Sequence, residues 1–336
     1  MEFIPGLQLN EQFYNGVVAS LLKRDFQNLV YSAALIGYGS DVLGFDSPVS
    51  MDHNWGPRMQ IFLSEKDFLK YGEVLTNYFS CSLPFEFMGF PTNFSPPRKD
   101  QTQTMQFKSS YPISHLIEIH TVHSYMQMKR NLDIADIENI TTADWLKLED
   151  QKLLELTSGQ IFHDGLGELT RLRNKISFFP HDILLYRLAK LWKMIQDEEA
   201  FVGQSVENET YMGAKIISAR LAEHCIKICF YLDKKYIPYS KWLLPSFRKL
   251  NIYSEVRPLV MEVLSENNPG QIEDKLCMLY TKVIEIHNRK KELPVINNKP
   301  VNFYNRSYKV IFAGTIVETL VNAISGNDLL TLAKSI

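Results

Sequence analysis

The stretch Gly37–Leu63, GYGSDVLGFDSPVSMDHNWGPRMQIFL, begins with a glycine-rich turn and ends in an apolar run. Between them lie Asp41, Asp46 and Asp52. Successive backbone N–H groups in a tight turn can cradle a phosphate, and carboxylates are common ligands of Mg²⁺ beside phosphates. The same pattern is also typical of an ordinary loop between two strands. The surrounding sequence must decide between these interpretations.

Strands and helices alternate around this stretch. The segment 29–40, LVYSAALIGYGS, predicts a buried strand that runs into the turn, and 50–63, SMDHNWGPRMQIFL, predicts a second strand. A third strand is expected at 115–122, HLIEIHTV. Apolar residues at helical spacing predict helices over 10–25 and 64–80. The first part of the chain is therefore expected to be α+β.

Two further segments stand out in this first part. Ser64 and Asp67, three residues apart, favour a capped start for the second helix. The proline-rich and polar segment 91–112 predicts a loop or flap.

The pattern becomes helical after Thr141. Apolar residues recur at helical intervals in 181–201 and 212–236, and no strand pattern of comparable strength returns. We therefore predict an α+β domain over residues 1–150 and a helical domain over 151–336. A length of 336 residues suits two domains.

Composition excludes some classes of function. The hydrophobic content of 45% is typical of a globular protein, and a net charge of −2 disfavours long nucleic acid as a partner. The N-terminal residues do not resemble a secretory signal, and the apolar run near the C-terminus is interrupted by Glu318. We expect a cytoplasmic protein that does not enter the membrane.

The candidate chemistry lies on the predicted strands. Asp52 and Asn54 are separated by one residue, so on a strand they would face the same side and reach one metal site. Glu118 lies in the separate strand at 115–122. A triphosphate bound beside such a site would have its charge neutralised by metal ions and backbone N–H groups.

This arrangement resembles the nucleotidyltransferase superfamily, in which a Gly-Ser turn precedes an acidic-x-acidic strand and a third carboxylate follows. The wider sequence is similar to a largely uncharacterised, mainly bacterial family, catalogued as a domain of unknown function and assigned to that superfamily. The segments that carry this similarity are YSAALIGYGSDVLGFDSPVSMDHNWGPR (31–58), LLELTSGQIFHDGLGELTRLR (153–173), PHDILLYRLAKLWKMIQDEEAFVG (180–203) and YIPYSKWL (236–243).

The resemblance implies an α+β fold with a nucleotidyltransferase-like mixed sheet and helices. Gly39 and Ser40 would contact the β- and γ-phosphates, Asp52 would bind Mg²⁺, and Glu118 would be the third acidic residue. Asn54 departs from the pattern, because its amide stands where a second carboxylate is expected. The predicted metal ligands are thus Asp52, Asn54 and Glu118, with one negative charge fewer than the superfamily pattern.

Asp41 or Asp46 would restore that charge if the loop between the strands folded back.

The resemblance also implies a helical C-terminal domain like that of kanamycin nucleotidyltransferase, closing over the cleft. Glu199 in this half is a candidate general base that removes a proton from the acceptor, and Lys241 is a candidate phosphate ligand. Alternatively, Glu199 ends a solvated helix and Lys241 is structural.

The leading hypothesis is an enzyme that transfers a nucleoside monophosphate from a magnesium-bound triphosphate, with ATP preferred, to a hydroxyl of a small-molecule or protein acceptor. Pyrophosphate would be released. The alternative is a catalytically weak or inactive nucleotide-binding module that acts as a sensor or partner protein. A homodimer or interaction protein built through Tyr236, Tyr239 and Trp242 is a third hypothesis.

Overall fold

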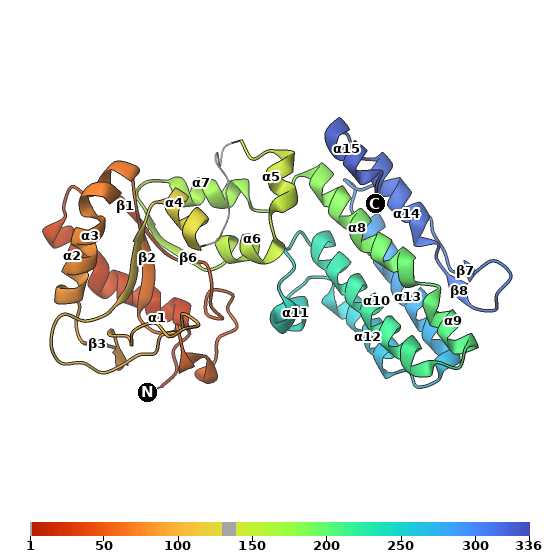
Figure 1. Ribbon diagram of the computed structural model, residues 1–336, viewed down its shortest axis with the longest axis horizontal. Helices are drawn as coiled ribbons and strands as arrows, with labels where there is room; N and C mark the ends of the chain where they lie inside the picture. Colours follow the sequence, from red (N-terminus) through yellow and green to blue (C-terminus); the bar gives the residue numbers. More distant parts are fainter. Residues whose placement is uncertain (1, 130–138) are drawn as a thin grey trace. The chain divides into compact units, whose positions relative to one another are not determined.

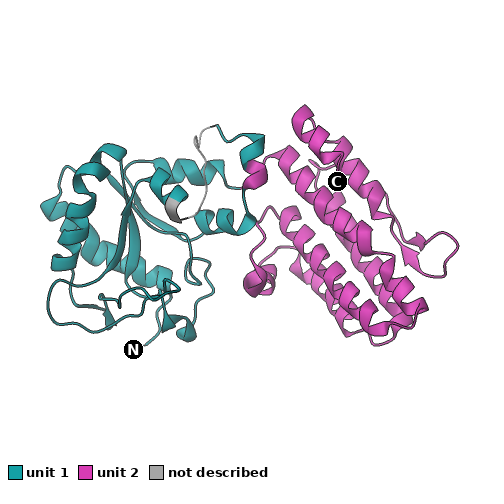
Figure 2. Ribbon diagram, viewed as in Figure 1, with its two compact units in different colours: residues 1–144, 148–177 teal, residues 145–147, 178–336 magenta. Residues whose placement is uncertain are grey.

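The computed structural model describes residues 2–129 and 139–336, and the chain divides into two compact units (Figure 2). Unit 1 comprises residues 1–144 and 148–177, and unit 2 comprises 145–147 and 178–336. The sequence analysis places the boundary near residue 150, whereas the contacts assign residues 151–177 to unit 1.

Unit 1 contains a four-stranded mixed sheet (Figure 1). Its strands are β1 (Tyr31–Leu35), β2 (Arg58–Leu63), β5 (Leu116–His120) and β6 (Gln160–Asp164). The spatial order is β5-β2-β1-β6, with β1 antiparallel to both of its neighbours and β2 parallel to β5. The central position of β1 and β2 places the turn that follows β1 beside the middle of the sheet.

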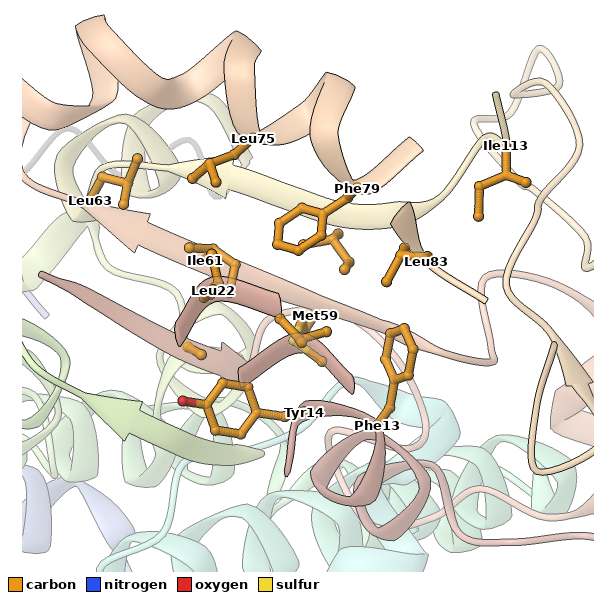
Figure 3. Close-up of a cluster of buried hydrophobic side chains, with 13 residues drawn as sticks. Phe13, Tyr14, Leu22, Met59, Ile61, Leu63, Leu75, Phe79, Leu83 and Ile113 are labelled. Carbon is orange, nitrogen blue, oxygen red and sulfur yellow. The ribbon is translucent and has the colours of Figure 1, made fainter. Parts of the chain in front are cut away.

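One face of the sheet is apolar and carries the core of unit 1. Met59, Ile61 and Leu63 alternate along β2 and are fully buried, together with Leu75 and Phe79 of the helix that follows (Figure 3). Because successive strand residues point to opposite faces, Arg58 and Gln60 lie on the other side. The site described below is built on that second face.

Helices cover the apolar face. The first helical segment runs without interruption through α1, a π-helical turn at Tyr14–Val18 and α2, and it supplies Phe13, Val18 and Leu22 to the core. Ser64 caps α3 by accepting the N–H of Asp67 at 3.1 Å. The helices of unit 1 are α1 (Gly6–Phe13), α2 (Ala19–Asp25), α3 (Glu65–Ser82), α4 (Val122–Ser124), α6 (Asp150–Thr157) and α7 (Glu168–Lys175), and α5 (Thr142–Lys147) includes residues of both units.

Unit 2 is helical apart from one short hairpin. Its long helices α8 and α10 bury the apolar residues that recur at helical spacing, such as Leu188, Ile195 and Leu221. The helix α8 packs against α14 and α10, and α10 packs against α13. The elements are α8 (His181–Glu198), α9 (Phe201–Glu207), α10 (Tyr211–Leu232), α11 (Ser240–Phe247), α12 (Tyr253–Ser265), α13 (Pro269–Asn288), β7 (Val301–Asn302), β8 (Lys309–Val310), α14 (Ala313–Asn322) and α15 (Asn327–Ala333).

The predicted fold class, α+β followed by a helical region, is confirmed. The second strand was predicted with the wrong start, and one strand of the sheet was not predicted. The second strand begins at Arg58 rather than residue 50, because residues 48–52 form a short 3₁₀ helix and residues 53–57 form an irregular segment with bends. The strand β6 at 160–164 was missed, because five residues without clear alternation carry little local signal until they pair with β1.

Short bridged segments accompany the loop predicted at 91–112. The two-residue strands β3 (Glu86–Phe87) and β4 (Phe90–Pro91) pair with each other, and Phe94 bridges Met105. Within residues 2–129 and 139–336, no helix combines the length and hydrophobicity needed to cross a membrane.

Candidate functional site

The glycine-rich turn after β1 is shaped by a buried ion pair. Gly39 has a φ of +130°, a conformation that side chains other than glycine rarely adopt. A Cβ atom at Gly39 would lie 2.2 Å from Asp41 Oδ1 and 2.5 Å from Arg58 Nη2. The turn therefore requires glycine at this position because the Asp41–Arg58 pair fills the space beside it.

The ion pair itself is almost fully enclosed. Arg58 Nη2 donates to Asp41 Oδ1 at 2.8 Å and to Oδ2 at 2.9 Å, and the two side chains are 3% and 2% exposed. Burial alone would lower the pKa of Arg58, but the adjacent Asp41 carboxylate raises it, so the guanidinium stays charged. Arg58 Nη2 also donates to the carbonyl of Tyr38 at 3.1 Å, which ties β2 to the turn.

Four consecutive backbone N–H groups of this turn have no acceptor in the part of the chain that the structure describes. They belong to Tyr38, Gly39, Ser40 and Asp41. By contrast, the N–H of Gly37 donates to the carbonyl of Glu155 at 2.9 Å. A run of uncommitted N–H groups around glycines with positive φ is the kind of backbone that binds anions. The turn thus offers donors suited to phosphate oxygens.

The end of β1 is held in place from two sides. Gln60 Oε1 accepts the N–H of Ile36 at 3.1 Å, and the hydroxyl of Tyr125 donates to the carbonyl of Ile36 at 3.1 Å. Gln60 is as buried as Arg58, and its amide oxygen positions the strand end. These bonds fix the starting point of the turn.

Glu118 and His120 lie on the same face of the sheet as Gln60. The parallel register pairs Gln60 with Glu118 and Phe62 with His120, so these side chains share one side. His120 Nε2 lies 3.7 Å from Glu118 Oε2, and the Glu118 carboxylate is close enough to contribute to the raised pKa of Arg58. Three segments thus supply polar groups on this side of the sheet: β2 supplies Arg58, β5 supplies Glu118 and His120, and the turn supplies Asp41.

Asp52 and Asn54 are not on a strand. Asp52 ends the 3₁₀ helix at Pro48–Asp52, and its carboxylate is 63% exposed and 2.9 Å from His53 Nδ1. Asn54 adopts a φ of +47°, and its Oδ1 accepts the N–H of Gln103 at 2.8 Å. The strand geometry that would point both side chains to one metal is therefore absent.

Asp41 and Asp46, the alternative sources of negative charge, are both engaged elsewhere. Asp41 pairs with Arg58, as described above. Asp46 Oδ2 accepts the backbone N–H of Gly6 at 2.7 Å and the indole N–H of Trp55 at 3.1 Å. Each aspartate anchors the loop between β1 and β2 instead of completing a metal site.

The predicted magnesium ligands do not fit a ready-made metal site. Across residues 2–129 and 139–336, no three His, Cys, Asp or Glu side chains are grouped so that they could hold a metal ion. The amide oxygen of Asn54 is already occupied by Gln103, and Asp52 faces His53. We therefore derive no chemical step through a metal from this arrangement.

Glu199, the predicted general base, is buried in unit 2. Its Oε2 accepts the N–H of Ile311 at 2.9 Å, and its Oε1 accepts the N–H of Ala313 at 2.8 Å, at the start of α14. Burial raises the pKa of Glu199, and these backbone donors partly oppose that shift. The geometry gives Glu199 a structural role as an anchor for a helix N-terminus, and proton abstraction by it stays a prediction.

Lys241, the predicted phosphate ligand of the helical half, is exposed on α11. Its Nζ lies 4.9 Å from the centre of the Trp242 ring. Phosphate binding by Lys241 stays a prediction.

The sequence analysis missed Arg58 as a site residue. Its signal was present, because Arg58 and Gln60 are polar residues at alternate positions of an otherwise apolar strand, RMQIFL. Polar side chains on the buried face of a strand need partners, and such a pattern marks a second, polar face. The partners themselves, Asp41 and Ile36, were not predictable from spacing.

Residues 145–243 match the model of a family described as Domain of unknown function (DUF4037). The chain is also similar to the crystal structure of a nucleotidyltransferase-like protein from Exiguobacterium sibiricum 255-15, with 11% sequence identity and a TM-score of 0.35. That similarity covers 94% of this chain and 89% of the other. Comparison with curated proteins gives no match.

Proposed function

We propose that unit 1 binds a nucleoside triphosphate, with its phosphates on the turn at residues 38–41. The observation that carries this proposal is the run of four backbone N–H groups without an acceptor among the described residues. Phosphate oxygens are suitable acceptors for such a run, and the backbone of the turn supplies the donors. Gly39 and Ser40, the predicted phosphate contacts, both belong to it.

The sequence motifs supply the reaction class. Their resemblance to nucleotidyltransferases supports transfer of a nucleoside monophosphate to a hydroxyl group, with release of pyrophosphate. We propose ATP as the nucleotide and a small molecule, or else a protein, as the acceptor. A net charge of −2 argues against a long nucleic acid in that role. In this proposal the turn positions the triphosphate. Glu118 is a carboxylate on the polar face of the sheet, the face that also carries Gln60.

A second candidate function is a nucleotide-binding module that does not catalyse transfer. The observation that favours it is the state of Asn54, a neutral amide whose oxygen accepts the N–H of Gln103. Because Asp52 also points to His53, a divalent ion would find no preformed set of ligands at these residues. We therefore include no metal ion in the proposed site, and nucleotide binding is tested with and without Mg²⁺.

Calorimetric titration with ATP, GTP, CTP and UTP, each with and without Mg²⁺, tests both candidates. The variants are Asp52→Ala and, as a matched control, Asp100→Ala, which removes another exposed carboxylate of unit 1. Binding that requires Mg²⁺ and is lost only in Asp52→Ala would support the enzyme. Binding that ignores both Mg²⁺ and Asp52→Ala would support the binding module. If no nucleotide binds, both candidates are wrong.

Asn54→Asp separates the two candidates further. Asp keeps an oxygen that can accept the N–H of Gln103, so the substitution is expected to change the free energy of unfolding by less than about 0.5 kcal/mol. If the chain is an enzyme, the added carboxylate should strengthen Mg²⁺-dependent nucleotide binding and increase pyrophosphate release. Unchanged binding and no pyrophosphate release in this variant would favour the module.

A further inference from the structure

The hydrogen bonds of Arg58 are concentrated on one of its three nitrogens. Nη2 donates to both oxygens of Asp41 and to the carbonyl of Tyr38. An arginine normally meets a carboxylate with two nitrogens side by side, one for each oxygen. Here both carboxylate oxygens of Asp41 accept from Nη2 alone, so the ion pair does not occupy Nε and Nη1.

Those other nitrogens have no acceptor in the described part of the chain. Nε is fully buried and makes no hydrogen bond, and Nη1 makes none either. A guanidinium carries five N–H donors, and buried polar groups are nearly always satisfied. Arg58 is thus a buried cation with more donors than the protein supplies acceptors.

Arg173, another arginine of unit 1, makes hydrogen bonds with all three of its side-chain nitrogens. Arg173 donates from Nε to the carbonyl of Leu156 at 3.0 Å, from Nη1 to that of Gly159 and from Nη2 to that of Ser158. All three nitrogens of Arg173 are committed to backbone oxygens. The different pattern of Arg58 calls for an additional acceptor.

The position of Arg58 indicates where that acceptor comes from. Its Nη2 lies against Gly39, and its guanidinium carbon is 5.2 Å from the centre of the half-exposed Tyr38 ring. Arg58 is therefore next to the turn whose own N–H groups lack acceptors. The guanidinium that carries the uncommitted Nε and Nη1 thus lies next to these backbone donors.

We propose that Arg58 is the cationic ligand of an oxyanion bound at this turn, and that the oxyanion is the di- or triphosphate group of the nucleotide. This inference rests on the proposed function and adds to it the residue that supplies positive charge. Asp41 acts as a positioning residue, because it holds the guanidinium against the turn through Nη2 and leaves Nε and Nη1 for the ligand. Phosphate bonds to arginine are charge-assisted and favoured by the planar shape of the group.

The test compares two variants that differ from each other only at residue 58. Asp41→Asn keeps Arg58 and an amide oxygen that can accept from Nη2, and it removes the competing negative charge. The double variant Asp41→Asn with Arg58→Gln removes both charges. Calorimetric titration with inorganic pyrophosphate and with ATP measures binding to each folded variant, with folding checked by circular dichroism. Arg173→Gln is the control for loss of a partly buried arginine in the same unit.

Asp41→Asn is expected to bind pyrophosphate at least as tightly as the natural chain, and pyrophosphate should raise its melting temperature more. The double variant is expected to bind at least about 10-fold more weakly than Asp41→Asn, since charge-assisted hydrogen bonds are lost. Arg173→Gln should leave the affinity unchanged. Equal affinities of Asp41→Asn and the double variant would overturn the role of Arg58.

The two ligands separate this inference from the proposed function. If ATP binds the natural chain and the double variant equally, the role of Arg58 is wrong while nucleotide binding stands. If pyrophosphate binds in an Arg58-dependent way and ATP does not bind, the oxyanion ligand stands and the nucleotide proposal is wrong. If neither ligand binds the natural chain, both are wrong.

Discussion

The two faces of β2 are equally buried but are stabilised in different ways. On one face Met59, Ile61 and Leu63 are fully buried among hydrophobic side chains, where their contribution follows the apolar area removed from water. On the other face Arg58 and Gln60 are 2% exposed, and every bond they make is specific in direction. Burial therefore does not distinguish core from site in this strand. Hydrogen bonding does distinguish them, because Arg58 on the polar face has N–H donors without an acceptor among the described residues.

The largest expected effect of a single substitution is on the polar face. Arg58→Gln leaves the Asp41 carboxylate buried without its cation, and breaking a buried ion pair in this way costs about 4 kcal/mol. Urea denaturation measures the loss. Adding Asp41→Asn to Arg58→Gln should recover more than half of it, because no buried charge then remains unpaired. A loss below about 1 kcal/mol for Arg58→Gln would contradict the importance of the pair.

On the apolar face, Ile61→Ala is expected to cost about 3 kcal/mol, from lost burial and the cavity left behind. Urea denaturation again gives the free energy of unfolding. This variant should leave the affinity for pyrophosphate or nucleotide unchanged as long as it is folded, since Ile61 points away from the turn. An affinity that falls together with stability would show that the two faces are not independent.

Gly39→Ala tests the close fit between the turn and the ion pair. It combines an unfavourable φ with a clash against Asp41 and Arg58, and we expect a loss of about 2 kcal/mol together with weaker anion binding. Gly167→Ala is the control for an added Cβ without a clash, because Gly167 also has a positive φ, of +70°, but no atom lies within 4 Å of the added Cβ. Equal losses in the two variants would show that backbone strain alone explains the effect.

The smallest expected effect is the pH dependence linked to Asp164, a residue of β6 next to β1. Desolvation would raise the pKa of Asp164, but hydrogen bonds from Ser32 and Thr170 outweigh it and the pKa is lowered. The contribution to stability is therefore fully present above about pH 4, the ordinary value, and is lost as pH falls through the lowered pKa. Asp164→Asn should make the melting temperature less sensitive to pH in this acid range. An unchanged acid profile would contradict the linkage.

Much of the fold could be predicted from local patterns. Helical periodicity located α3, α8 and α10, and apolar runs located β1 and β5. The capping interaction of Ser64 was visible in the sequence because it joins residues three apart. The strand β6 was missed, since its five residues are defined by pairing with β1 across more than a hundred positions. A local sequence pattern can therefore predict a helix or a strand, but it does not predict which distant strand pairs with it.

The candidate site was predictable only in part. The turn at Gly39 and Ser40 and the strand with Glu118 were found, because glycine spacing and an apolar run are local signals. Asp52 was expected on a strand with Asn54, yet residues 48–52 form a 3₁₀ helix that begins with a proline. Glu199 was expected at a reactive or solvated position, yet it is buried by the start of α14, which is more than a hundred residues away in the chain.

The sequence by itself determined the order of elements, the α+β character of the first half and the glycine-rich turn, because these depend on the short-range rules of periodicity and backbone conformation. Only the tertiary structure decided which charges meet. Asp41 pairs with Arg58, and Asp46 pairs with Gly6 and Trp55, because the register of β1 and β2 and the path of the loop between them bring these groups together. Three aspartates that look alike in the sequence thus end up buried, partly buried and exposed, and their chemistry follows from those surroundings.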